Sequence, residues 1–325
     1  MDDLSPSDLK SILHSKRANI YYLEHCRVLV NGGRVEFVTE EGKRSLYWNI
    51  PIANTTTVLL GTGTSVTQAA MRELAKAGVL VGFCGGGGTP LFSANEVDFE
   101  VAWFSPQSEY RPTEYLQLWI RFWFDDVQRL EAGRMIQRAR LSQIREQWLQ
   151  NRVLRDLGFR IDEKVLQGVL EQSLGAITAA PDVTHLLTEE ARLTKKLFKI
   201  AADVTNYGEF TRSLRGTGAD PANRFLDHGN YLAYGLGATA TWVLGLPHGL
   251  AVLHGKTRRG GLVFDAADLI KDALVLPQAF LSATKRDDEQ QFRQACIEQF
   301  TRCEALDFMI DTLKSIAGTL GRASP

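Results

Sequence analysis

The sequence predicts an α+β protein in which a small β-rich N-terminal domain with one helix precedes a larger all-helical C-terminal domain. Short apolar runs separated by glycine and asparagine turn signals fill the first hundred residues. From residue 113 onward, long segments avoid proline and carry apolar side chains every three or four residues. Composition changes between Pro106 and Pro112. We therefore place the boundary at about residue 105, giving domains 1–104 and 105–325.

The length and charge of the chain limit the classes of protein it can belong to. Its 325 residues suffice for two hydrophobic cores. The formal net charge of −1 excludes a strong overall field, so a nucleic-acid site would have to be a local patch. The four cysteines form no C-x-x-C pair, which favours buried reduced thiols over a structural zinc site or a disulfide framework; they are Cys26, Cys84, Cys296 and Cys303.

The N-terminal residues and the apolar runs bear on location. The opening MDDLSPSDLK is acidic and polar, whereas a secretion signal is basic and then apolar. No apolar run approaches the roughly 18 residues that a membrane span needs. We expect a cytoplasmic soluble protein with no membrane partner.

Short apolar segments of the N-terminal domain predict strands. They are Asn19–Glu24, Arg27–Val30, Arg34–Thr39, Ser45–Ile50, Thr57–Leu60 and Val79–Phe83. The pair Asn31-Gly32 predicts a tight hairpin. An amphipathic helix is expected after the turn Gly61–Ser65. That turn could bind phosphate at the helix N-terminus, or Thr64 or Ser65 could simply cap the helix. Neither glycine-rich phosphate-binding motif is complete here, which favours the cap.

Apolar periodicity predicts helices throughout the C-terminal domain. They are expected within Thr113–Leu154, Glu163–Ile177, Glu189–Val204, Pro221–Leu244, Ala266–Leu276 and Asp288–Leu313.

Four arginines in the first of these segments recur at spacings of four, seven and seven residues. They are Arg134, Arg138, Arg145 and Arg152. This spacing would keep them along one stripe of a helix, where they could follow a DNA backbone. The alternative is a solvated face with scattered ion pairs.

Residues 248–272 gather more polar chemistry than any other stretch. They contain His248 and His254, a basic run at Lys256, Arg258 and Arg259, an expected strand at Leu262–Phe264, and two carboxylates. The spacing of Asp265 and Asp268 places both on one face of a helix, with Cβ atoms roughly 5 to 6 Å apart. Such a pair could share Mg²⁺ or Mn²⁺. Asp265 could instead be the N-cap of a helix beginning at Ala266.

A metal site here would need a ligand from elsewhere in the chain. The best candidates are Glu189 and Glu190, on a helix for which Thr188 is the expected N-cap. Either glutamate could merely favour the first turn of that helix. Spacing alone does not choose between them.

Several segments together resemble the CRISPR-associated adaptation integrase family. They are Glu190–Arg192, Asp220–Arg224, Gly245–Gly249, His254 and Leu262–Asp268, with the turn Gly61–Thr67 in the first domain. Their order and spacing match nearly from end to end. Residues 223–231 and 254–261 are most similar to the type I-F branch.

The resemblance implies a ligand set and further contacts. Glu190, His254 and Asp268 would hold Mg²⁺ or Mn²⁺, with Asp265 beside them as a further ligand or as a carboxylate that supports one. Beside such a site, the basic residues Lys256, Arg258 and Arg259 are predicted to hold phosphates of the scissile strand. This chain has Lys271 where the family often has an arginine.

The resemblance also implies an activity and partners. The enzyme would insert short spacer DNA into a repeat array, so its DNA partners would be the double-stranded spacer precursor and the array. A homodimer through the β-rich domains and a second adaptation protein, fused to a helicase-nuclease in the type I-F branch, would complete the assembly. Two other functions stay open: a metal-dependent nuclease of branched DNA repair intermediates, and a non-catalytic helical scaffold that binds DNA or protein.

Overall fold

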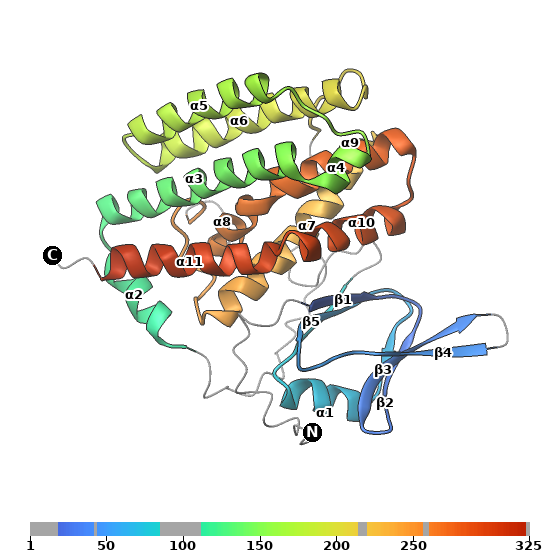
Figure 1. The fold of residues 1–325 in the computed structure, drawn as a ribbon. Coiled ribbons are helices and arrows are strands. Elements are labelled where there is room, and N and C mark those ends of the chain that lie inside the picture. The colour runs from blue at the N-terminus through green and yellow to red at the C-terminus, as the bar shows by residue number, and fades with distance from the viewer. Residues whose placement is uncertain (1–18, 42–43, 85–111, 214–219, 256–259, 323–325) are drawn as a thin grey trace. The chain divides into compact units, whose positions relative to one another are not determined.

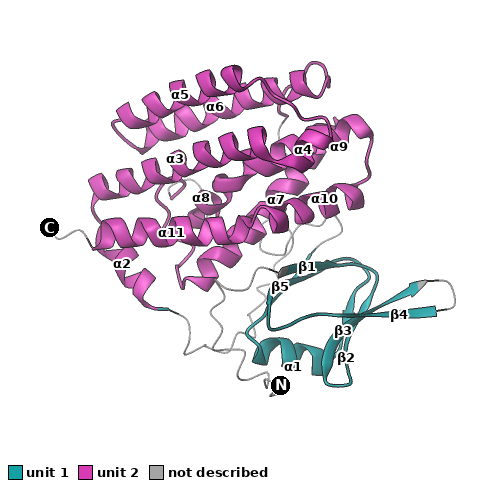
Figure 2. Cartoon of the chain, viewed as in Figure 1, with its two compact units in different colours: residues 1–112 teal, residues 113–325 magenta. Residues whose placement is uncertain are grey.

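The chain forms two compact units, residues 1–112 and 113–325, in a computed structural model (Figure 2). The structure describes residues 19–41, 44–84, 112–213, 220–255 and 260–322. Within these ranges the first unit holds all the strands and one helix, and the second is helical, which confirms the predicted α+β class. The predicted boundary near residue 105 lies outside the described residues and stays a prediction. None of the described helices is long and apolar enough to cross a bilayer.

The strands of the first unit form two sheets (Figure 1). One is parallel, with the order β1 (Asn19–Leu23), β5 (Thr55–Leu60), β7 (Leu80–Phe83). The other has the order β4 (Arg44–Asn49), β3 (Arg34–Glu41), β2 (Arg27–Asn31), β6 (Ser65–Val66). Every strand predicted for this unit is present, with ends that differ by a few residues, and β6 is an additional short strand that was not predicted.

The predicted hairpin between β2 and β3 is confirmed. Its two central residues, Gly32 and Gly33, have φ angles of 55° and 78°. Both values lie in the left-handed region, which a two-residue hairpin of this type requires and which glycine adopts without strain. Asn31 and Arg34 therefore pair directly across the turn.

The helix α1 (Gln68–Lys76) begins later than predicted. The hydroxyl of Thr67 accepts a hydrogen bond from the amide of Ala70 at 3.2 Å, so Thr67 is the N-cap. The prediction that Thr64 or Ser65 caps the helix is wrong because Ser65 belongs to β6, which pairs with β2. Thr64 instead donates its hydroxyl to the carbonyl of Leu23 at 2.9 Å, which ties the turn to the end of β1.

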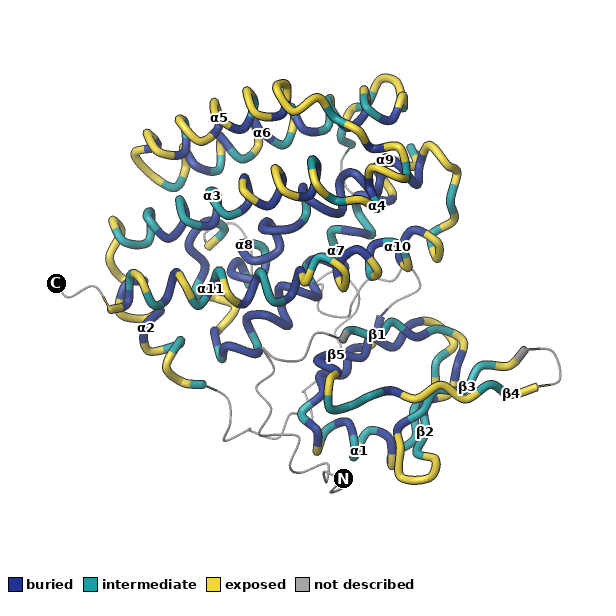
Figure 3. The backbone as a smooth tube through the Cα atoms, viewed as in Figure 1, coloured by how far each residue is buried: buried dark blue, intermediate teal, exposed yellow. Residues whose placement is uncertain are grey.

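Helices make up the second unit (Figure 1). They are α2 (Glu114–Trp123), α3 (Asp126–Gln150), α4 (Arg152–Asp156), α5 (Glu163–Ala179), α6 (Val183–Val204), α7 (Pro221–Val243), α8 (Gly261–Ile270), the π-helical turn η3 (Lys271–Val275), α9 (Leu276–Lys285), α10 (Glu289–Arg302) and α11 (Ala305–Gly321). Helices α7 and α8 are largely buried within this unit (Figure 3).

Close packing holds the segment from α8 to η3 against α7. A Cβ atom at Gly237 of α7 would lie 2.7 Å from the carbonyl oxygen of Val263 in α8. A Cβ atom at Gly229 would lie 2.3 Å from Cγ1 of Val275 in η3. Only glycine permits these approaches, because interiors are packed too densely for the neighbours to give way. This packing against the buried helix α7 fixes the position of α8, and with it the position of the two α8 carboxylates, Asp265 and Asp268.

Two helix starts near the candidate site differ from prediction. Helix α6 begins at Val183, where the Asp182 carboxylate accepts a hydrogen bond from a first-turn amide. Thr188 is therefore inside the helix and not its N-cap, and its hydroxyl donates to the carbonyl of Thr184 at 2.9 Å. As a result, Glu190 lies in the interior of α6, away from its first turn.

Helix α8 begins at Gly261, so the predicted strand at Leu262–Phe264 is wrong. Gly260, with a φ of 71°, occupies the cap position. Asp265 therefore lies within the helix and cannot be its N-cap. The apolar run that suggested a strand is apolar because nearly all of α8 is buried, and periodicity cannot separate a buried helix from a buried strand.

The predicted helix Asp288–Leu313 is two helices, α10 and α11. The Asp288 and Gln291 side chains form a capping box at the start of α10. Glu304 has a φ of 48°, which breaks the helical path before α11 begins.

Candidate metal centre

Three side chains predicted as ligands converge in the second unit. Glu190 comes from α6, His254 from the loop between α7 and α8, and Asp268 from α8. One oxygen or nitrogen atom of each lies within 4.8 Å of the others. His254 Nε2 is 3.7 Å from Glu190 Oε2, and His254 Nδ1 is 3.9 Å from Asp268 Oδ2. The structure therefore brings together residues that spacing alone could not connect.

The carboxylate oxygens of this cluster fit a divalent cation. Glu190 Oε2 and Asp268 Oδ2 are buried and have no hydrogen-bond partner among the described residues. Buried polar atoms are nearly always hydrogen-bonded, and leaving one unpaired is unfavourable. Two carboxylates and one imidazole form a donor set that suits Mg²⁺ or Mn²⁺. A cation placed among them would satisfy both oxygens.

The charge around the cluster leads to the same conclusion. Its nearest charged neighbours are Lys271, which forms an ion pair with Asp268, and Arg140, which forms a buried ion pair with Asp272. The four carboxylates of Glu190, Asp265, Asp268 and Asp272 outnumber these two cations. With a neutral His254 the described group has a formal charge of −2, which one divalent cation balances.

Asp265 holds His254 and the loop around it. Its side chain is fully buried, and its Oδ1 is 2.8 Å from His254 Nδ1. The same carboxylate accepts hydrogen bonds from three consecutive backbone amides, those of Val252 at 2.7 Å, Leu253 at 3.1 Å and His254 at 3.0 Å. A carboxylate on one ring nitrogen fixes the orientation of an imidazole and directs the other nitrogen to the ligand position. Here that nitrogen is Nε2, which faces Glu190.

Two tryptophans of α2 hold the preceding part of the loop. Trp119 Nε1 donates to the carbonyl of Leu250 at 3.0 Å, and Trp123 Nε1 donates to that of Ala251 at 2.8 Å. These bonds join residues more than 120 positions apart, so no local pattern of the sequence could predict this role. At the other end of the loop, Gly261 packs directly against the backbone of His254. A Cβ atom at Gly261 would lie 2.7 Å from the carbonyl oxygen of His254, so only glycine fits there.

Burial and neighbouring charges shift the pKa values of the cluster. Burial, together with the charge of Asp268, raises the pKa of Glu190 to about 7, although Arg140 and Lys271 oppose this. Burial alone would lower the pKa of His254, but the hydrogen bond to Asp265 and the nearby carboxylates raise it above its usual value. Burial would raise the pKa of Asp268, but Lys271 and His254 outweigh it and keep that pKa low. The pKa of Glu190 therefore lies close to neutral pH, and the pKa of His254 lies above its ordinary value.

The predicted DNA-contacting residues are only partly described. Lys256, Arg258 and Arg259 lie outside the described residues, so their role stays a prediction. On α3, Arg134 and Arg138 both form ion pairs with Glu131, at 3.0 and 2.9 Å. These pairs agree with the alternative of a face with scattered ion pairs at this end of the helix.

The four predicted arginines do not share one helix. Asn151 ends α3, and its side chain accepts hydrogen bonds from the first amides of α4. Arg152 therefore belongs to α4, while Arg145 is exposed near the end of α3. The prediction of a single helical stripe is wrong for Arg152 because a side-chain cap interrupts the helix. Whether the four residues contact DNA stays a prediction.

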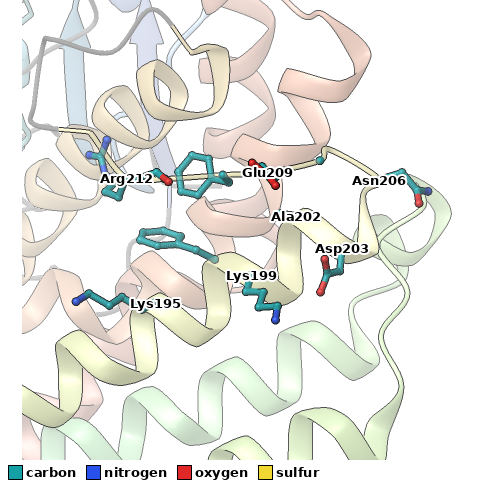
Figure 4. A pocket seen from close by; sticks show the side chains of 11 residues that line it. Lys195, Lys199, Ala202, Asp203, Asn206, Glu209 and Arg212 are labelled. Atoms are coloured by element: carbon teal, nitrogen blue, oxygen red, sulfur yellow. The ribbon is translucent and has the colours of Figure 1, made fainter.

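A separate hollow of about 910 Å³ lies along the C-terminal half of α6 (Figure 4). Its lining includes Phe198, Phe210, the cations Lys195, Lys199 and Arg212, and the carboxylates Asp203 and Glu209. None of the three cluster residues is among the described residues that line it. Arg212 is paired with Asp227 and bonded to Asn223 Oδ1 at 2.8 Å, whereas Lys195 and Lys199 are exposed. Both lysines are on α6, the helix that carries Glu190.

Comparison with known proteins identifies the family. The family model described as CRISPR associated protein Cas1 matches residues 21–296. This chain belongs to the Cas1 family. A CRISPR-associated endonuclease Cas1 from Pseudomonas aeruginosa (strain UCBPP-PA14) is 74% identical over 317 residues, covering 98% of each protein. The predicted family resemblance is confirmed.

Solved structures share the Cas1 fold. The crystal structure of a TtCas1–DNA complex has a TM-score of 0.64 at 21% identity, covering 94% of each chain. A casposase bound to its integration product has a TM-score of 0.59 at 14% identity, covering 82% of this chain and 73% of that one. At these identities the likeness concerns the fold.

Proposed function

We propose that this chain is a metal-dependent DNA endonuclease and integrase of CRISPR adaptation, which inserts short spacer DNA into a repeat array by transesterification of a phosphodiester. The cluster of Glu190, His254 and Asp268, with its two unpartnered buried carboxylate oxygens, carries the proposal. Membership of the Cas1 family supports it, as does the relative named an endonuclease. The shared fold with a casposase bound to its integration product supports joining as well as cleavage.

The cluster residues have distinct roles in this proposal. Glu190, His254 and Asp268 would hold Mg²⁺ or Mn²⁺, and Asp265 would orient His254 as a positioning residue. When bound, the ion supplies charge stabilisation to the attacking and leaving oxygens of an in-line displacement. Lys271, paired with Asp268, limits the negative charge that approaching phosphates meet.

The same site can serve two nucleophiles. Water would cleave a strand, and the 3′-hydroxyl of an incoming DNA end would join it. Backbone phosphates would be held by Lys256, Arg258 and Arg259, with the arginines at 134, 138, 145 and 152 as a further track. Contacts of this kind give affinity but little sequence discrimination.

The partners proposed are double-stranded DNA, a second copy of this chain and a second adaptation protein, fused to a helicase-nuclease in the type I-F branch. The first unit offers a surface for the homodimer. Among the strands that the structure describes, β4 is at the edge of its sheet, and Tyr47 and Trp48 on it are 56% and 51% exposed. Unpaired edge strands with exposed aromatic side chains are suited to pairing with another chain.

The decisive experiment compares joining with cleavage. Purified protein, with Mn²⁺ and the second adaptation protein, is given DNA with free 3′-hydroxyl ends and a plasmid that carries the repeat. We expect joined products that are absent without metal. Cutting of branched DNA with no joining would favour a repair nuclease, and binding without either reaction would favour a scaffold.

Metal affinity should depend on pH near neutrality. A metal ligand must be deprotonated, and the pKa of Glu190 is raised to about 7 in the metal-free protein. The pKa of His254 is also raised, so its proton competes with the ion more strongly than the proton of an ordinary histidine does. We expect the Kd for Mn²⁺, measured calorimetrically, to fall as pH rises from 6 to 8. A pH-independent Kd over that range would contradict the assignment of Glu190.

A further inference from the structure

A buried arginine joins the two helical segments that carry the carboxylate ligands. Arg140, on α3, has a side chain only 2% exposed. Its Nη2 donates to Thr194 Oγ1 on α6 at 2.6 Å, and its Nε donates to Asp272 Oδ2 in η3 at 2.8 Å. Its Nη1 donates to Gln137 Oε1 on its own helix at 2.9 Å. One guanidinium thus contacts three elements.

Both contacts across elements lie one helical turn from a ligand. Thr194 follows Glu190 by four residues on α6, and Asp272 follows Asp268 by four residues where α8 passes into η3. Trp148, also on α3, donates its Nε1 to the carbonyl of Asp272 at 2.9 Å. Helix α3 therefore binds both the side chain of Asp272, through Arg140, and its backbone carbonyl, through Trp148.

The turn that Arg140 holds is irregular. The amide of Leu276 bonds to the carbonyl of Lys271, five residues back, which is the π-helical pattern. Single π turns within α-helices are frequent at functional sites. Asp272 of this turn is held by Arg140.

A gain in stability is a poor explanation for this arrangement. Removing two charges from water costs about as much as their attraction returns, so an apolar pair of similar volume is often equally stable. The planar guanidinium, however, fixes several acceptors at once in a set geometry, which lysine cannot do. Specific geometry is what a metal centre assembled from separate helices requires.

We propose that Arg140 is a positioning residue for the metal centre, setting the separation of Glu190 and Asp268 by bridging Thr194 and Asp272. This inference rests on the proposed function, because it assumes that the two carboxylates bind one ion. The hydrogen bonds of Arg140 go to Gln137, Thr194 and Asp272, and none of these three is a proposed ligand. It acts through the helices that carry the ligands.

The test measures Mn²⁺ binding to the metal-free protein by calorimetry, together with thermal unfolding. In Arg140→Lys the charge stays but the bridge is lost, and we expect the Kd to rise about 10- to 100-fold, as for other residues that support metal ligands. Arg155→Lys, an exposed arginine on α4, is the control and should keep the parental Kd.

A second pair of variants keeps the test decisive if Arg140→Lys does not fold. Thr194→Val removes only the hydroxyl that accepts from Arg140, whereas Thr194→Ser retains it. We expect Thr194→Val to weaken Mn²⁺ binding about tenfold and Thr194→Ser to restore it. Equal Kd values for Thr194→Val and Thr194→Ser, or a parental Kd in folded Arg140→Lys, would overturn this inference and leave the proposed function standing. A parent protein without Glu190-dependent Mn²⁺ binding would overturn the proposed function, and the inference with it.

Discussion

Glu190→Gln is expected to reduce Mn²⁺-dependent strand joining at least about 100-fold while leaving the metal-free protein as stable as the parent. Loss of residues that merely support metal ligands typically costs 10- to 100-fold, and a ligand itself should cost more. Stability should hold because Glu190 Oε2 is buried without a hydrogen-bond partner among the described residues, and its pKa is raised by burial. A neutral amide is easier to bury than a carboxylate. Joining assays and urea denaturation of the same preparation measure both effects.

The neighbouring glutamate supplies the matched control. Glu189 is on the same helix, but its carboxylate is bonded to Arg192 at 2.5 and 2.6 Å. Glu189→Gln should therefore keep parental joining and lose only a small amount of stability. The assignment would be contradicted by the reverse result, in which Glu189→Gln loses joining and Glu190→Gln retains it.

The choice between these two glutamates shows where spacing stops being informative. The sequence predicts a helix start at Thr188, which would make both residues first-turn carboxylates. The structure begins the helix at Val183, so Glu189 and Glu190 are interior residues about 100° apart around the axis. One faces Arg192 and the other faces His254. The sequence does not show which face of α6 is directed inward, so only the family resemblance could select Glu190.

Local features of the fold were predictable because they depend on neighbouring residues. The strands, the Asn31-Gly32 hairpin and most helices follow from alternation, turn chemistry and periodicity, and the structure contains them. Long-range contacts were not predictable. The Arg140–Asp272 pair joins residues 132 positions apart, and no local pattern records it. Asp265 was open to interpretation as a helix cap for the same reason, since its partners lie in the preceding loop.

Asp265→Asn is expected to lower the free energy of unfolding by about 2 to 5 kcal/mol and also to weaken Mn²⁺ binding. The carboxylate accepts from three backbone amides and faces His254 Nδ1, using both oxygens. An asparagine has only one acceptor oxygen, and its NH₂ group would face some of those donors. Each buried donor left without a partner costs about 1 to 3 kcal/mol. Urea denaturation and calorimetric Mn²⁺ titration measure the two effects.

The two carboxylate-to-amide changes therefore separate ligand from support. Glu190→Gln should lose joining and keep stability, whereas Asp265→Asn should lose both, because Asp265 holds the loop that presents His254. Asp311→Asn, at a carboxylate 73% exposed on α11, controls for the chemical change and should alter stability by less than about 0.5 kcal/mol. If Asp265→Asn unfolded with the parental free energy, its hydrogen bonds could not be what fixes the loop. Asp265 would then be better explained as a further ligand, one whose charge matters only when the ion is bound.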